Sequence, residues 1–333
     1  MAEILKQVVN VKDLSIYEIY SQSGEANPHV HRFIASTPQS RSICNDPNVA
    51  GTRYTTRLCE ACSAIFKNYD FGLVERETVV LNILRGALNF GLRDALANGL
   101  GWWRHNTSFI SAQRARDDNN PENWHIEENS YKKVYFPSRA SIVLGDVVAT
   151  GTSLRYGLNQ VLDVAQKQKT QLSNIVFFTY GGKQSEVIFT ELDKKCRQLF
   201  PEYKQTFVIY LEGRFEVPDA NSKLTIRFTG TDLVRGGSLM APEFVQSQYE
   251  KPTYPLERCT IYDAGSRAFW IPEYLEDVVD YWKQTLELAN KGTTFQALLA
   301  ERFPELDASK FGNVDLKDLC TKHLAELDNT FHH

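Results

Sequence analysis

Acidic, hydroxylated and glycine residues follow an apolar segment near the middle of the chain. The run Ser141-Ile142-Val143-Leu144 leads into Gly145-Asp146-Val147-Val148-Ala149-Thr150-Gly151-Thr152-Ser153. A strand that passes into a helix start presents free backbone N–H groups, which stabilise a bound anion. The hydroxyl groups would add donors, the glycine at 151 would allow close approach, and the Asp146 carboxylate would accept hydrogen bonds from a ribose diol. The pattern favours a sugar-phosphate site over its alternative, an ordinary strand-to-helix turn with a glycine cap.

Three other segments place arginine or acidic residues among small ones. An apolar stretch, residues 79–84, ends in Arg85-Gly86-Ala87, and residues 113–118 have the sequence Gln-Arg-Ala-Arg-Asp-Asp. Further along, Tyr262-Asp263-Ala264-Gly265-Ser266-Arg267 surrounds an acid with small residues. In this order, and together with the segment around Asp146, they resemble the ligand-binding segments of the type I phosphoribosyltransferases, most closely those of the uracil phosphoribosyltransferase family. The resemblance covers about residues 50–270.

The resemblance implies a phosphoribosyltransferase, an enzyme of the pentosyltransferase class. It would transfer the phosphoribosyl group of phosphoribosyl pyrophosphate (PRPP) to a small nitrogenous heterocycle, uracil-like by default, and release pyrophosphate. Asp146, Arg85 and Arg116 would be the catalytic residues. The residues expected to contact PRPP are Arg85, Gly86, Arg116, Asp146, Val147, Ala149, Thr150, Gly151, Thr152, Ser153 and Asp263. The residues expected to contact the acceptor are Ile261, Tyr262, Asp263 and Ala264.

The two arginines would act on the leaving group. Displacing pyrophosphate from C1 of the ribose builds positive charge on the ring and negative charge on the pyrophosphate. Arg85 and Arg116 would neutralise the pyrophosphate, since a guanidinium is a planar and permanently charged donor, although Arg114 and Arg139 are rivals of Arg116. The resemblance also implies Mg²⁺ as a cofactor that bridges pyrophosphate and ribose oxygens, with unknown protein ligands. It implies a homodimer as well.

The chain departs from the family pattern at single positions near the sugar and the acceptor. Gly145 replaces the first acid of the usual pair, so Asp146 would hold the ribose hydroxyls alone. Tyr262 and Ser266 replace a glycine and an aspartate of the C-terminal signature. Two alternatives to uracil salvage therefore stay open. One is an enzyme of specialised metabolism that makes an unusual or carbon-linked nucleotide on a non-uracil acceptor, and the other is a PRPP-binding regulator without turnover.

One segment, residues 226–239, has no recognised counterpart in the family. Two interpretations are open, a cover over the acceptor site and a surface loop. Its two arginines, Arg227 and Arg235, would suit an acidic acceptor.

Strand and helix patterns alternate along most of the chain. Apolar runs of strand length are followed by stretches of about 10–15 residues with helical periodicity, which predicts an α/β fold with a doubly wound, mostly parallel sheet. The carboxyl ends of its strands would bring the suspected loops to one crevice. The polar stretch 116–130 is interpreted as a mobile loop, a hood that closes over PRPP. The predicted strands are 78–84, 108–112, 141–144, 174–180 and 207–212, and the predicted helices are 56–69, 88–96, 153–166, 184–199, 274–289, 294–302 and 316–327.

The length and composition indicate a soluble protein with a sizeable core. The chain has 333 residues, of which 42% are hydrophobic and 23% charged. We expect an N-terminal arm (1–50), a phosphoribosyltransferase-like domain (51–270) and a C-terminal helical extension (271–333). A net charge of -4 argues against general binding to nucleic acid, and the chain shows neither a membrane-length apolar run nor a signal-peptide core. These features predict a cytoplasmic protein with neither nucleic-acid nor membrane partners.

The cysteines are interpreted as reduced thiols. Six of them are scattered along the chain without the spacing of a disulfide framework. Cys59 and Cys62 form a single Cys-x-x-Cys pair within a predicted helix. We favour two cysteines on an amphipathic helix over zinc or redox chemistry, because no second pair accompanies them.

Overall fold

The computed structural model describes residues 3–21, 29–84, 90–117, 120–128, 131–148, 150–219, 221–226, 233–258 and 264–331. Within these ranges, the backbone alone is described for residues 113–117, 120–128, 264–265 and 330–331.

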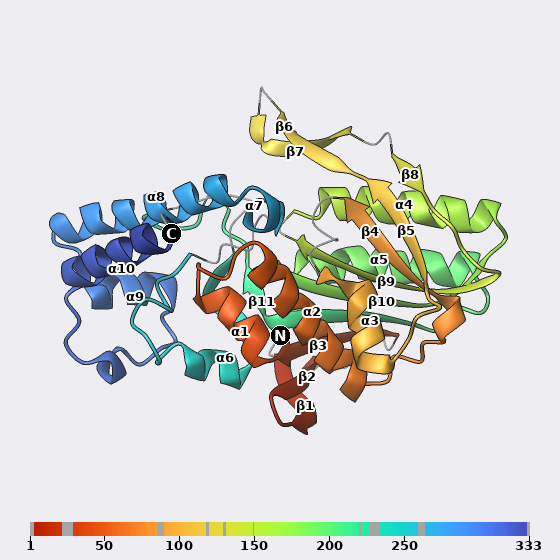
Figure 1. The fold of residues 1–333 in the computed structure, drawn as a ribbon, viewed down its shortest axis with the longest axis horizontal. Helices are drawn as coiled ribbons and strands as arrows, with labels where there is room; N and C mark the ends of the chain where they lie inside the picture. Colours follow the sequence, from red (N-terminus) through yellow and green to blue (C-terminus); the bar gives the residue numbers. More distant parts are fainter. Residues whose placement is uncertain are drawn as a thin grey trace.

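A ten-stranded mixed sheet forms the centre of the molecule (Figure 1). Its strands are β1 (Glu3–Val11), β2 (Leu14–Ser21), β3 (Val30–Ser36), β4 (Thr78–Leu84), β5 (Asn106–Ser111), β8 (Lys132–Lys133), β9 (Arg139–Val148), β10 (Gln171–Gly182), β11 (Gln205–Glu216) and β12 (Val234–Met240). The order is β1-β2-β3-β11-β10-β9-β4-β5-β8, with β12 paired to β11 beside this path. The six strands from β3 to β5 in this order run parallel to one another.

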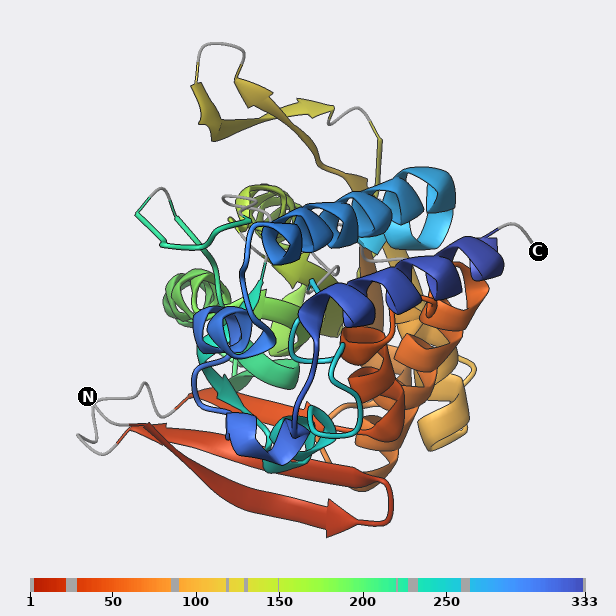
Figure 2. The same cartoon turned by 90° about the vertical axis from the view of Figure 1, so that its left-hand side faces the viewer.

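Helices cover both faces of the parallel part of the sheet. They are α1 (Pro38–Asn45), α2 (Thr52–Asn68), α3 (Leu92–Leu100), α4 (Thr152–Lys167) and α5 (Gln184–Leu199). The first three lie on one face, whereas α4 and α5 lie on the other (Figures 1 and 2). The strands between them carry continuous apolar runs, such as Val79 to Leu81 in β4 and Ile142 to Leu144 in β9, all of which are buried. Such runs are typical of parallel strands covered on both sides. The predicted doubly wound α/β fold is thus confirmed.

The stretch interpreted as a mobile loop contains regular structure instead. Strands β6 (Gln113–Asp117) and β7 (Asn120–Glu128) pair as an antiparallel hairpin that projects from the sheet beyond β5 (Figure 2). The interpretation of residues 116–130 as a loop was therefore wrong for most of its length. The sequence in between, Asp118-Asn119, consists of turn-forming residues, and the flanking residues are mostly polar.

The two ends of the chain add to the central layers. Strands β1 to β3 lengthen the sheet beyond β11, while the C-terminal segment is helical (Figures 1 and 2). Its helices are α8 (Ile271–Asn290), α9 (Phe295–Arg302) and α10 (Leu316–Phe331), with a 3-10 turn at η3 (Ala308–Phe311). Two short helices precede them, α6 (Pro242–Ser247) and α7 (Ala264–Phe269). A further 3-10 turn, η1 (Glu75–Glu77), lies directly before β4. None of the helices in the described ranges combines the length and apolar character needed to cross a membrane.

Candidate functional site

The strand order of the sheet reverses between β4 and β9. After β4 the chain continues to β5 on one side, whereas after β9 it continues through α4 to β10 on the other side. In open α/β sheets, ligands bind outside the carboxyl ends of the strands at such a switch point. Strands β4 and β9 are direct neighbours, with Leu81 opposite Leu144 in register. The ends of these two strands, Leu84 and Val148, therefore flank the position where the fold favours a ligand site.

Polar side chains lie at the carboxyl end of β9 and directly after it. Asp146 is half-buried, lies opposite Thr179 of β10 in register, and accepts a hydrogen bond at 2.9 Å from the backbone N–H of Val147. The hydroxyl oxygens of Thr150 and Thr152 are 3.5 Å apart, and both residues are partly exposed. The carboxylate and the hydroxyl groups thus lie within seven residues that span the end of β9 and the start of α4.

Glycine is required at the start of α4. Gly151 is the N-cap residue with a φ of 75°, a left-handed conformation that residues with a side chain rarely adopt. A Cβ there would lie 2.3 Å from Cδ1 of Ile188 on α5. No side chain caps the helix and its first turn carries no acidic residue. The first N–H groups of α4 are therefore left for an anion to bind, which is the usual property of such a helix start.

The glycine before Asp146 is explained by packing. A Cβ on Gly145 would lie 2.5 Å from Cγ of Phe90, whose side chain is fully buried. Phe90 therefore packs against β9 at the residue before Asp146. The ring occupies the space in which an acidic side chain at position 145 would have to fit.

A cavity of about 430 Å³ opens at the carboxyl ends of β9, β10 and β11. It is lined by Thr150, Lys183, Gln184, Phe215, Glu216 and Val217. Sequence reasoning did not select Lys183, which is the N-cap residue of α5. The signal that could have found it is the run Gly181-Gly182-Lys183 between an apolar strand and a helix, the same arrangement that drew attention to residues 141–153.

The structure brings together only part of the predicted site. Asp146 and Val147 lie near the end of β9, Thr150 and Gly151 in the connection to α4, and Thr152 and Ser153 in the first turn of α4. Arg116 lies on β6 opposite Trp124, and its side chain is not described. Ala264 is the first residue of α7. The predicted residues that lie outside the described ranges are Arg85, Gly86, Ala149, Ile261, Tyr262 and Asp263.

Two buried arginines near the predicted acceptor segment donate hydrogen bonds to backbone carbonyl groups. Arg267 donates to the carbonyl oxygens of Ile43, Asp46 and Val49 at 2.9, 2.8 and 2.6 Å. Arg235 donates to the carbonyl oxygens of Cys44 and Glu257 at 2.8 and 2.5 Å, and it is only 4% exposed. The suggestion that Arg235 would suit an acidic acceptor was therefore wrong, because its buried guanidinium already donates to two backbone carbonyls. Arg227 lies outside the described residues.

The segment with no family counterpart is partly a strand. Residues 234–240 form β12, which pairs antiparallel with β11. This part of residues 226–239 is therefore a strand of the central sheet and not a surface loop. The interpretation as a cover over the acceptor site stays a prediction.

The predicted Cys-x-x-Cys pair lies on α2. Cys62 is fully buried, and burial raises the pKa of its thiol well above the usual value; burial also raises the pKa of the half-buried Cys59 thiol. Both thiols are therefore protonated at neutral pH, which is unfavourable for redox or metal chemistry.

Metal binding by protein side chains alone has no support in the described residues. No group of three or more His, Cys, Asp or Glu side chains is arranged to hold an ion in those ranges. Asp146, with the hydroxyls of Thr150 and Thr152 nearby, fits a Mg²⁺ ion that takes most of its oxygen ligands from a bound phosphate compound and from water.

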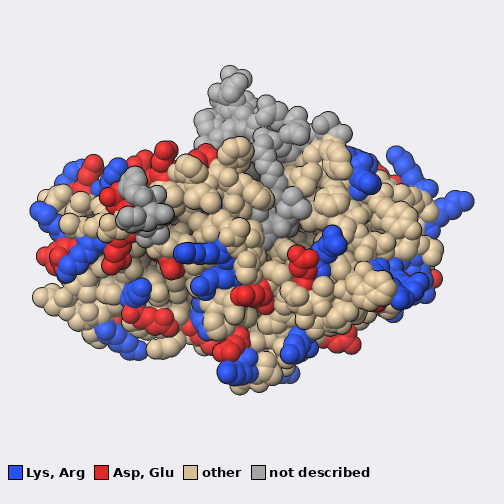
Figure 3. Space-filling view, viewed as in Figure 1, with Lys and Arg blue, Asp and Glu red and all other residues tan. Residues whose placement is uncertain are grey.

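Positive and negative side chains are interspersed on the face shown in Figure 3. The described part of this face therefore carries no large basic area of the kind that binds nucleic acid.

Two solved structures are similar to part of the chain. A hypoxanthine-guanine phosphoribosyltransferase from Bacillus anthracis, with a HEPES molecule in its active site, has 15% sequence identity and a TM-score of 0.26, over 40% of this chain and 70% of that one. A hypoxanthine phosphoribosyltransferase from Trypanosoma cruzi, in a ternary complex with substrates, has 13% identity and a TM-score of 0.26, over 62% and 92%. No protein-family model and no curated protein sequence matches the chain.

Both similar structures are phosphoribosyltransferases, and neither is named as a uracil enzyme. The predicted closeness to the uracil family stays a prediction. At these TM-scores the similarity carries no argument about activity, so the functional conclusion has to come from the site itself.

Proposed function

We propose that the chain is a PRPP-dependent phosphoribosyltransferase whose active site lies at the carboxyl ends of β4 and β9. The observation that carries this proposal is the connection from β9 to α4. It combines a half-buried carboxylate, two hydroxyl groups and an uncapped helix start at the switch point of the sheet. An anion that also carries a diol, such as a ribose phosphate, matches these groups.

Each end of PRPP would have its own set of contacts. The backbone from Ala149 to Ser153 would bind the ribose phosphate, and Asp146 with Asp263 would hold the ribose hydroxyls. Arg85, the backbone of Gly86, and Arg116 would bind the pyrophosphate, since guanidinium groups match phosphate oxygens in pairs. Mg²⁺, when bound with the substrate, would neutralise part of the pyrophosphate charge.

The reaction would be a displacement at C1 of the ribose. A ring nitrogen of the acceptor forms the new bond to C1, and the C1–O bond to pyrophosphate breaks, with its electron pair leaving on the pyrophosphate. The ring nitrogen gives up its proton to solvent. The protein would contribute by holding both ends of PRPP and by stabilising the charge on the leaving group. The acceptor, a small heterocycle with uracil as the default, would contact residues 261–264.

One observation favours the alternative of a PRPP-binding regulator without turnover. Phe90 occupies the space of a second acidic side chain at position 145. A site that keeps one of two ribose contacts would still bind PRPP, but with less control of its orientation.

The two functions differ in turnover. Titration calorimetry with PRPP and Mg²⁺ should detect binding to the full chain, and pyrophosphate release should appear when a panel of bases is added. Binding without release for any base would support the regulator. Absence of PRPP binding would contradict both, and the exposed α4 residue Asp163, changed to Asn, provides a variant that should behave like the wild type.

A further inference from the structure

A solvent-exposed tryptophan lies near the amino ends of β4 and β5, at the opposite edge of the parallel strands from the proposed active site. Trp103 follows the end of α3 by three residues, and at 73% it is the most exposed large hydrophobic residue in the described ranges. Val74 and Leu100, in the segments on either side of it, are exposed as well. Exposed apolar side chains that lie together mark a surface for another molecule.

The loop that carries Trp103 is fixed by hydrogen bonds. Glu75 Oε1 accepts from the backbone N–H groups of Trp103 and Arg104, both at 2.7 Å. These bonds lower the pKa of the Glu75 carboxyl, which is therefore charged at neutral pH. The Arg104 guanidinium lies over the indole, 4.2 Å from the ring centroid. The indole is thus held in a defined position, so it would lose little conformational freedom on binding.

An apolar cavity lies beside this loop. Its volume is about 360 Å³, and it opens between the end of α2 and the residues that follow α3. The two helices approach closely there, since a Cβ on Gly99 would lie 2.7 Å from the carbonyl oxygen of Ser63. The apolar residues that line the cavity are Phe66, Tyr69, Phe71, Leu73, Leu100 and Trp102. An exposed aromatic side chain and a cavity that can receive one are therefore neighbours on the same chain.

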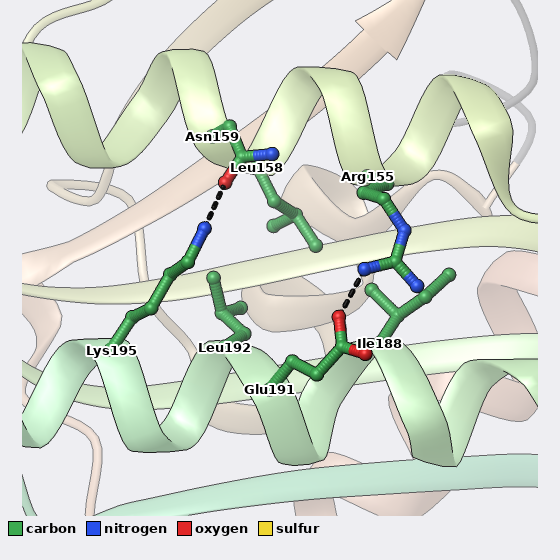
Figure 4. A pocket seen from close by; sticks show the side chains of 7 residues that line it. All are labelled: Arg155, Leu158, Asn159, Ile188, Glu191, Leu192 and Lys195. Atoms are coloured by element: carbon green, nitrogen blue, oxygen red, sulfur yellow. Dashed lines mark hydrogen bonds and ion pairs between the residues drawn. The ribbon is translucent and has the colours of Figure 1, made fainter.

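The hollow between α4 and α5 differs from this cavity in size and in its contacts (Figure 4). Its volume is only about 30 Å³. Arg155 forms an ion pair with Glu191 across it, and Lys195 donates to Asn159 at 3.0 Å. The side chains of the two helices bridge that hollow themselves, whereas the cavity beside Trp103 has room for a side chain from another molecule.

The charges around the tryptophan and the cavity are complementary to each other. Lys67 and Asp70 line the cavity and are exposed, while Glu75 and Arg104 flank the indole. Each side thus offers one charge of each sign. Within the described residues, Lys67, Asp70 and Arg104 form no ion pair. A second copy of the chain that inserts its indole brings Arg104 toward Asp70, and such pairs at a rim fix the orientation of two partners more than their affinity.

We propose that this tryptophan surface, made of Trp103, its loop and the adjacent cavity, joins two copies of the chain in a twofold dimer. Each copy inserts its Trp103 into the cavity of the other. A twofold interface uses the same patch on both subunits, so that patch must be complementary to itself. A surface that contains both the inserting group and its receptor meets this condition. The inference goes beyond the proposed function and does not depend on it.

Sedimentation equilibrium of the full chain over a range of concentrations measures the dimer dissociation constant. Trp103→Ala should raise this constant about 100-fold or more, because two central indoles are lost from each dimer. Trp270→Ala removes another exposed tryptophan, at the start of α8, and should leave the constant unchanged. The circular dichroism spectra of both variants should match that of the wild type.

Mixing two variants tests the reciprocal insertion. Leu100→Glu places a charge in the cavity wall and should also weaken the dimer about 100-fold or more, although Trp103 is intact. A mixture of Leu100→Glu with Trp103→Ala should form a mixed dimer that is tighter than either variant alone. In it, the intact indole of one variant enters the intact cavity of the other.

Several results would overturn the inference. A wild-type chain that stays monomeric at every concentration has no such interface. A dimer that Trp103→Ala does not weaken uses another face, and failure of the two variants to associate would exclude reciprocal insertion. Growth beyond a dimer as the concentration rises would indicate a head-to-tail contact instead. Failure of PRPP to bind would contradict the proposed function alone.

Discussion

Charged side chains are used differently at the carboxyl ends of the strands and in the packing of the C-terminal helices. At the strand ends, Lys183 and Glu216 face a cavity and have no ion-pair partner among the described residues. Near the C-terminal helices, Arg267 is fully buried and bonds three backbone carbonyls. Glu257, 3% exposed, accepts from the indole N–H of Trp282 at 2.9 Å. A charge with fixed protein partners holds the fold together, whereas a charge that faces a cavity is available to a ligand.

The largest effect on stability is expected at Arg267. Replacing it with Met leaves three buried carbonyl oxygens without a donor and removes the cation between the rings of Tyr54 and Tyr274. We expect the free energy of unfolding in urea to fall by roughly 3–5 kcal/mol. The exposed Arg104, changed to Met, should cost less than about 0.5 kcal/mol. A loss below about 1 kcal/mol for Arg267→Met would contradict the anchoring role.

Asp146 should show the opposite behaviour, a large effect on turnover and little on stability. Asp146→Asn keeps the shape of the side chain and removes the charge that we propose to hold the ribose hydroxyls. Pyrophosphate release should slow by about 100-fold or more, while the melting temperature changes by a few degrees at most. Near-normal turnover in this variant would remove Asp146 from the catalytic set and weaken the contrast between the two regions.

Glu212 is a third case, a buried carboxyl group whose hydrogen-bond partners are uncharged. It is fully buried with a φ of 66°, and it accepts hydrogen bonds from the Ser36 hydroxyl at 2.6 Å, the Thr37 N–H at 3.0 Å, and the Ser40 hydroxyl. Burial raises the pKa of its carboxyl from 4.5 to about 7. The folded state therefore binds the proton more tightly than the unfolded state does.

The sign of the resulting pH dependence follows from the raised pKa. The contribution of Glu212 is fully present below pH 4.5 and is lost as the pH rises toward 7, by up to about 3 kcal/mol. In urea unfolding, the stability of the wild type relative to Glu212→Gln should fall over this range. A constant difference between the two proteins from pH 4.5 to 8 would show that the carboxyl is charged throughout.

The smallest of these effects concerns position 145. Gly145→Asp restores the acid of the family pattern but forces its Cβ against the ring of Phe90. We expect a loss of about 1–3 kcal/mol from overpacking. In the background Phe90→Ala the same substitution should cost less, since the ring is gone. If Gly145→Asp is equally harmful in both backgrounds in thermal unfolding, Phe90 is not the reason for the glycine.

The regular elements of the sheet could be predicted because their patterns are strong. The apolar run of β4 and the helical periodicity of α5 gave the observed bounds, Thr78–Leu84 and Gln184–Leu199. The hairpin of β6 and β7 was missed because polar, two-stranded ribbons lack the apolar face that marks a strand. No elements were predicted in the first 50 residues, where β1 to β3 continue the central sheet.

The site could be predicted only where local geometry decides it. The connection from β9 to α4 depends on residues adjacent in sequence, so its glycine, hydroxyls and carboxylate were recognisable. Burial depends on the whole fold. The sequence around Arg235 therefore did not indicate that its guanidinium is buried and donates to backbone carbonyls. The exposed charges of Lys183 and Glu216 come together through strand register, which a single sequence does not contain.

Helix α8 joins parts of the chain that are far apart in sequence. Along its length, Tyr274 donates to the carbonyl oxygen of Pro47 and Tyr281 to that of Leu256, at 2.8 and 2.6 Å. Removing residues 271–333 would thus take donors away from two segments, one after α1 and one before α7. The sheet and the C-terminal helices should melt together, and circular dichroism and tyrosine fluorescence should trace a single cooperative transition.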